Sequence, residues 1–116
     1  MAKAKDKLAI LRGTLDVLVL RSVSARPLHG FEISLWLEER SNGALAIDDS
    51  ALYQALHRLE AKKLVVGEWG VSENNRRARY YELTTAGRAH LDEASAQMVS
   101  YAKTITNLLT VAARPR

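Results

Sequence analysis

The fold is decided by the stretch DDSALYQALHRLEAKKLVVGEWGVSENNRRARYYEL, residues 48–83. Its first part predicts a helix over residues 49–62, with Asp48 as the N-cap because an Asp side chain can accept a hydrogen bond from a backbone N–H of the first turn. The buried face of this helix is expected to carry the apolar residues that recur at spacings of three and four, namely Leu52, Ala55, Leu56 and Leu59. The rest of the stretch predicts two strands, 64–71 and 78–83, joined by a turn at residues 72–75.

The opposite face of the same helix carries hydrogen-bonding side chains. With about 100° of rotation per residue, Ser50, Gln54 and His57 fall on this face, and Tyr53 and Arg58 flank it. A polar helix beside a basic hairpin suits duplex DNA, because the helix fits the major groove and the cations meet phosphates or the minor groove. The alternatives are an ordinary solvated face and, for Tyr53, a half-buried aromatic with a local hydrogen bond.

Positive charge is concentrated in this part of the chain. Residues 58–79 contain six cations against three acids, namely Arg58, Lys62, Lys63, Arg76, Arg77 and Arg79 against Glu60, Glu68 and Glu73, whereas the whole chain has a net charge of +4. Such a concentration is typical of phosphate neutralisation.

Each candidate DNA contact has an expected role. We expect Ser50, Gln54 and His57 to reach the groove, with Gln54 as the main reader of bases. Tyr53 and Arg58 are expected to bind phosphate. The hairpin loop is expected to add sequence-independent affinity through Asn75, Arg76 and Arg77.

The composition excludes several classes of protein. The 116 residues, of which 47% are hydrophobic and 26% charged, indicate one folded domain. The absence of cysteine excludes disulfides, thiol catalysis and cysteine-based zinc sites, and it fits a cytoplasmic protein. No apolar run has the length of a membrane span, so we expect no membrane partner.

Two further helices precede the decisive stretch. The first is expected over residues 8–25, with an inward stripe formed by Leu15, Leu18, Val19, Ser22 and Val23. Because Val17 and Leu20 widen its apolar surface, a second subunit is expected to cover part of it. The first helix is expected to end at residues 26–30, because Pro27 cannot continue a helix. A second helix is expected over residues 29–40, ended by turn residues, and residues 44–47 are expected to form a short strand. This order predicts a mainly α fold with a small β-hairpin (α+β), a winged helix-turn-helix.

A long helix is expected at the C-terminal end. It is capped by Thr84 or Thr85 and extends to about residue 113, roughly 40 Å. A heptad stripe is formed by Leu91, Ala94, Met98, Tyr101, Ile105, Leu108 and Ala112. We expect this stripe to form a dimer interface; the alternative is that the helix folds back along the first helix of the same subunit.

The domain organisation follows from these elements. We expect residues 1–7 to form a short basic arm, either frayed or in contact with DNA. A winged helix DNA-binding domain is expected over 8–84 and a dimerisation helix over 85–113, with a frayed tail over 114–116.

Several segments resemble the PadR family of bacterial transcriptional regulators. The matching segments are LRGTLD (11–16), HGFEI (29–33), LYQALHRLE (52–60), GEW (67–69), RRARYYELT (76–84) and GR (87–88). They occur in the order and at the intervals of the family, over about residues 8–91.

The resemblance implies a homodimeric winged helix protein of the smaller size class. Such proteins bind a palindromic operator in double-stranded DNA, usually as repressors, and are often released by a small molecule. Some members bind flat aromatic compounds near tryptophans between subunits, which makes Trp36 and Trp69 candidates for binding a small aromatic effector. Gln54 stands where the family usually has proline, so the resemblance does not carry over base specificity.

Two other classes of function compete with DNA binding. An enzyme is disfavoured because His29, His57 and His90 have no metal-ligand spacing and no Gly-rich phosphate loop is present, so neither a catalytic residue nor a metal or cofactor is expected. A protein–protein adaptor, using the heptad helix and the basic patch, is the stronger alternative.

Overall fold

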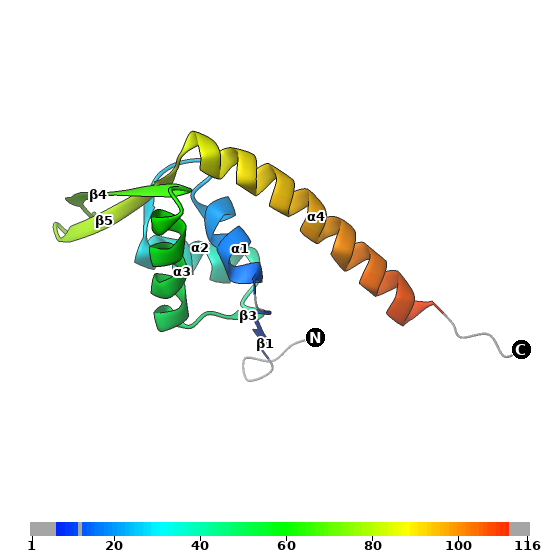
Figure 1. Ribbon diagram of the computed structural model, residues 1–116. Coiled ribbons are helices and arrows are strands. Elements are labelled where there is room, and N and C mark those ends of the chain that lie inside the picture. The colour runs from blue at the N-terminus through cyan, green and yellow to red at the C-terminus, as the bar shows by residue number, and fades with distance from the viewer. Residues whose placement is uncertain (1–6, 12, 112–116) are drawn as a thin grey trace, which may run out of the picture.

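The computed structural model describes residues 7–11 and 13–111. Within these ranges it is a mixed α+β fold, with three short helices, two small sheets and a long C-terminal helix (Figure 1). In chain order the elements are β1 (Leu8–Ala9), α1 (Thr14–Ser22), β2 (Leu28–His29), α2 (Gly30–Arg40), β3 (Leu45–Ala46), α3 (Asp49–Ala61), β4 (Val65–Val71), β5 (Arg77–Leu83) and α4 (Thr85–Thr110). The expected fold class is confirmed.

The helix α3 forms as predicted. Asp48 is its N-cap, and the Asp48 carboxylate accepts a hydrogen bond from the backbone N–H of Ala51 at 3.1 Å. The four residues of the expected apolar face are at most 1% exposed and lie in the core between α1, α2 and the sheet: Leu52, Ala55, Leu56 and Leu59. Burial of this face fixes which side of α3 is left for solvent.

The hairpin β4–β5 also forms as predicted and is joined by a third strand. The antiparallel sheet has the order β2-β5-β4, with Leu28 opposite Tyr81 and Val65 opposite Leu83. Near the helices, Val65 and Tyr81 are buried, whereas the far end of the hairpin projects beyond the core (Figure 1). The strand β2 was not predicted, because two residues are too few to show an alternating pattern.

The predicted start of the first helix, at residue 8, was wrong. Leu8–Ala9 form a strand parallel to β3, and the backbone N–H of Leu8 donates to the carbonyl of Ala44 at 2.7 Å. The helix α1 begins only at Thr14, because Gly13 has a φ of +88°, a left-handed conformation that glycine adopts readily and that interrupts a helix. The same helix ends at Ser22 instead of residue 25.

The C-terminal helix α4 is capped by Thr84. The Thr84 hydroxyl accepts from the N–H of Gly87 at 2.9 Å and donates to the carbonyl of Lys63 at 2.7 Å. The first turns of α4 pack on the core, where Leu91 is 3% exposed. The distal part of α4 extends away from the rest of the fold (Figure 1). Leu91 therefore packs within its own protomer and not on an exposed seam.

Some expectations lie outside the described residues. These concern residues 1–6 of the basic arm, residue 112 of the heptad stripe and the tail after it. In the described part of the chain, no helix combines the length and the apolar character needed to cross a membrane.

Candidate nucleic-acid interface

The solvent side of α3 carries the three side chains that the sequence placed there. Ser50, Gln54 and His57 are all exposed, on the side of the helix opposite its buried residues. Each therefore has its hydrogen-bonding groups available to a partner that approaches α3 from solvent. The structure confirms this placement; the contact of each residue with bases stays a prediction.

Tyr53 lies at the edge of this face, against the start of α2. Its side chain is 52% exposed, so it is neither free of the protein nor a core aromatic. A Cβ atom on Gly30 would overlap the Tyr53 ring and hydroxyl, so the Tyr53 side chain packs directly on the backbone at the first residue of α2. This packing holds the phenol at a fixed place beside α3.

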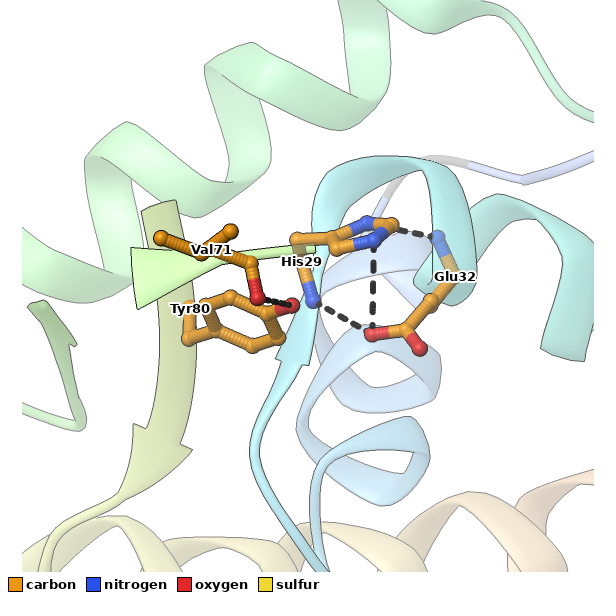
Figure 2. A network of polar contacts seen from close by, with 4 residues as sticks. All are labelled: His29, Glu32, Val71 and Tyr80. Carbon is orange, nitrogen blue, oxygen red and sulfur yellow. Dashed lines mark hydrogen bonds and ion pairs between the residues drawn. The ribbon is translucent and has the colours of Figure 1, made fainter. Parts of the chain in front are cut away.

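The start of α2 is stabilised by a capping box that the sequence reasoning missed (Figure 2). The His29 Nδ1 atom accepts from the backbone N–H of Glu32 at 3.2 Å, and the His29 N–H donates to the Glu32 carboxylate at 3.1 Å. The imidazole also meets the edge of Tyr80, with 5.2 Å between ring centroids. The signal for this role was that His29, whose ring can accept a hydrogen bond, stands three residues before Glu32 and two residues after Pro27.

The Tyr80 side chain links the two strands of the hairpin. Its hydroxyl donates to the carbonyl of Val71 at 3.4 Å, as Figure 2 shows. Tyr81, the next residue, points to the other face of the sheet and is buried, and burial raises the pKa of its hydroxyl. Tyr80 therefore packs across the hairpin, whereas Tyr81 packs into the core.

The tip of the hairpin presents the expected basic residues. Asn75 adopts a left-handed φ of +58° in the turn, and Arg76 and Arg77 follow it on the exposed end of the hairpin. Among the residues that the structure describes, neither arginine forms an ion pair. Both guanidinium groups are thus available for phosphates.

Two other arginines of the basic stretch already have acidic partners. Arg58 donates to Asp16 of α1, with an Nη2 to Oδ1 distance of 2.7 Å, and this hydrogen bond raises the pKa of Arg58. Arg79 forms an ion pair with Glu60 of α3. Arg58 therefore connects α3 to α1, and a phosphate at this position has to compete with Asp16.

The two candidate effector tryptophans are not brought together. Trp69 lines an open groove of about 670 Å³ between α2, α3 and the hairpin, together with Phe31 and Tyr53. Trp36 does not line this groove; it packs against the core and under the guanidinium of Arg40 at 5.2 Å. The groove also contains acidic side chains, so its lining is of mixed charge.

No metal centre is found in the described ranges, since no group of three or more potential ligands lies close enough together there.

The arrangement as a whole is that of a winged helix-turn-helix protein: three helices, a three-stranded sheet, and a basic hairpin beside the exposed face of the third helix. This class binds DNA through that helix and that hairpin.

Comparison with known proteins identifies the family. The model of the transcriptional regulator PadR-like family matches residues 19–93. The transcriptional regulator Rv3488 of Mycobacterium tuberculosis is 36% identical over 83 residues, which cover 71% of this chain and 73% of that protein. The chain belongs to the PadR-like family of transcriptional regulators.

Solved structures agree with this assignment. A PadR-like transcriptional regulator of Bacillus cereus superposes with a TM-score of 0.75 at 25% identity and covers 88% of this chain and 97% of its own. A PadR family regulator of Eggerthella lenta gives a TM-score of 0.72 at 29% identity, over 87% and 86% of the two chains. The protein is thus a DNA-binding transcriptional regulator of a family whose members are not enzymes.

Proposed function

We propose that this regulator represses transcription by binding a palindromic operator as a homodimer. The observation that carries the proposal is the exposed polar face of α3 beside a hairpin tip whose Arg76 and Arg77 have no acidic partner among the described residues. An α-helix of this kind fits the major groove, where each base pair presents a distinct pattern of donors and acceptors. The hairpin cations then neutralise the adjacent phosphates.

Gln54 is proposed as the main base reader. It is exposed at the centre of the polar face, and its amide can donate to and accept from adenine at the same time. Ser50 and His57 lie on the same face and are proposed as supporting groove contacts. Tyr53, held beside Gly30, is proposed to bind phosphate and to fix the register on the duplex.

The dimer is proposed to form through the distal part of α4. This part projects beyond the core (Figure 1), and Tyr101 and Leu108 are 67% and 68% exposed. Ala94, Met98 and Ile105 lie on the same heptad stripe and are half-buried in the protomer. A helix with so many exposed apolar residues gains stability when a second copy covers it.

Two further features are part of the proposal. The operator lies in the bacterial cytoplasm, where the regulator is proposed to act. A small aromatic effector is proposed to release it, with Trp69 as the better candidate because it lines a groove and Trp36 does not.

The decisive experiment is selection of bound sequences from a random duplex pool. A palindrome with half-sites about 34–36 Å apart, one helical turn, supports both sequence-specific binding and dimer symmetry. Recovery of no enriched sequence, or of an asymmetric single site, would contradict the proposal.

The role of Gln54 is tested on the selected site. Gln54→Ala is expected to lower affinity for that site by about 1–3 kcal/mol and to leave affinity for random DNA nearly unchanged. Gln97→Ala is the control for loss of a glutamine side chain away from α3, because Gln97 is exposed on α4. Since Gln97 stands next to Met98 of the proposed dimer stripe, the dimer dissociation constant of this control is compared with that of wild type. Equal losses on both DNAs would show that Gln54 does not read bases.

The role of Arg77 is tested through salt dependence. Arg77→Ala is expected to weaken binding to all sequences alike and to reduce the slope of log affinity against log salt by about one. Arg21→Ala, at an exposed position of α1, removes the same charge elsewhere. A slope unchanged by Arg77→Ala would remove this residue from the phosphate contacts.

A further inference from the structure

One face of the hairpin carries aromatic and guanidinium groups in alternation. Trp69 of β4 lies opposite Arg79 of β5, and the same face continues to Arg77 at the tip and Tyr81 at the core. The Arg77 guanidinium carbon is 4.6 Å from the centre of the Trp69 ring, and that of Arg79 is 5.9 Å from the same ring. Arg79 is also 5.9 Å from the ring of Tyr81. We call Arg77, Trp69, Arg79 and Tyr81 the hairpin ladder.

The ladder is fixed to the core at both of its inner members. Tyr81 is 8% exposed and belongs to the hydrophobic core. Arg79 forms an ion pair with Glu60 of α3, and the hydrogen bond to that carboxylate raises the pKa of Arg79. The ladder therefore connects the recognition side of α3 to the tip of the hairpin.

Gly67 provides the space for this connection. A Cβ atom on Gly67 would lie 2.5 Å from Arg79 Nε, closer than real side chains approach. The Arg79 side chain thus crosses over the backbone of Gly67 on its way to α3. Any larger residue at this position has to displace the guanidinium from its present course.

The hairpin ladder offsets the electrostatic repulsion between Arg77 and Arg79. Arg77 and Arg79 lie on the same face two residues apart, where two cations repel each other. Glu60 neutralises Arg79, and the electron-rich face of an indole attracts guanidinium groups. Arg77 is thereby held near Trp69 before any partner arrives, which lowers the cost of ordering a long side chain on binding.

We propose that Glu60, Arg79 and Trp69 are positioning residues that orient Arg77 for DNA, although none of the three needs to touch a phosphate. This inference rests on the proposed DNA contact of Arg77 and adds the groups that act through it. It has an unusual consequence for Glu60. Removing an acid near DNA normally strengthens binding, because it lowers repulsion of phosphates. Removing this acid is expected to weaken binding, because it releases Arg79 and with it the ladder.

The first test compares Glu60→Gln with Glu68→Gln. Both variants remove one negative charge at nearly constant shape, and Glu68 is exposed on the other face of the same hairpin. Glu60→Gln is expected to reduce affinity for random duplex DNA by about two- to tenfold, the range that corresponds to ordering one long side chain. Glu68→Gln is expected to leave affinity unchanged or to raise it. Equal strengthening by both variants would overturn the proposal.

The second test is a double-mutant cycle in which Arg77→Ala is made in wild type and in Arg79→Met. In wild type it is expected to flatten the salt slope by about 0.9, whereas in Arg79→Met the change is expected to be clearly smaller. Arg21→Ala in both backgrounds is the control for charge alone, since Arg21 lies on α1. Equal effects of Arg77→Ala in the two backgrounds would show that Arg79 does not act through Arg77.

A DNA-free measurement separates the failure of the ladder from the failure of the proposed function. The Nε–H resonance of Arg77 is expected to be displaced by the ring current of Trp69 and to return toward its free position in Trp69→Leu and in Glu60→Gln. An Arg77 resonance that neither variant moves would overturn the ladder even if DNA binds. Absence of DNA binding by wild type, with the resonance displaced as expected, would instead contradict the proposed function.

Discussion

Two leucines of the same heptad stripe are expected to respond in opposite ways to the same change. Leu91 is 3% exposed within its own protomer, whereas Leu108 is 68% exposed on the projecting part of α4. Leu91→Ala opens a cavity in the protomer core and is expected to cost about 2–5 kcal/mol of unfolding free energy. Leu108→Ala is expected to change the stability of an isolated protomer by no more than about 0.5 kcal/mol.

The effect of Leu108 appears only in the dimer. Full burial of a leucine contributes about 1.5–3 kcal/mol, and about two thirds of this side chain remains to be covered, so about 1–2 kcal/mol is lost per protomer. Two symmetric copies make the loss about 2–4 kcal/mol, which weakens the dimer by about 30-fold or more. Leu109→Ala, at the next position and about 100° around the helix, is the matched control and is expected to weaken the dimer less.

Sedimentation equilibrium gives the dimer dissociation constant, and urea unfolding at two protein concentrations separates the two kinds of stability. Wild type is expected to unfold at higher urea when the protein is more concentrated, because dissociation is linked to unfolding. Leu91→Ala lowers the midpoint at both concentrations. A wild-type midpoint independent of concentration, or a Leu108→Ala dimer as strong as wild type, would refute the reasoning.

Three further predictions concern pH, packing and charge. Burial raises the pKa of the Tyr81 hydroxyl, so the folded state keeps this proton at pH values where the unfolded chain loses it. The free energy of unfolding is therefore expected to fall as pH rises past about 10. Tyr81→Phe should make this fall shallower in urea titrations, and an identical fall in the variant would contradict the shift. Gly87→Ala should destabilise by about 1–3 kcal/mol in the same assay despite its better helix propensity, because the new Cβ overlaps the carbonyl of Leu64; a stabilised variant would be the opposite result. Asp16→Asn releases Arg58 and should steepen the salt slope of DNA binding by about one; an unchanged slope would show that Arg58 does not reach a phosphate.

Prediction from sequence worked where one local pattern had one structural outcome. The helix α3, its Asp48 cap and its buried leucines follow from spacing and cap chemistry that act over a few residues. The hairpin followed from two β-prone runs around a polar turn. These elements also carry the exposed polar face, so local patterns were enough to locate most of the candidate site.

Prediction failed where pairing with a distant segment set the outcome. Residues 8–13 continue an apolar helical pattern, yet Leu8 and Ala9 pair with Leu45 and Ala46, which lie far away in sequence. The strand β2 exists only because Leu28 and His29 find partners on β5. A strand of two residues is too short to show the alternation of apolar and polar side chains by which strands are recognised in a sequence.

The sequence by itself determined the helix α3, the hairpin β4–β5 and which side of α3 is left to solvent, because amphipathic spacing, capping and turn chemistry are local. Only the tertiary structure decided that Arg58 and Arg79 are held by Asp16 and Glu60 while Arg76 and Arg77 form no ion pair in the described part of the chain. It also decided that Leu91 belongs to the core and Leu108 does not. The physical reason is that a charge count or a heptad stripe does not specify which side chains contact each other in the folded protein. These contacts decide which cations and which leucines remain exposed to a partner.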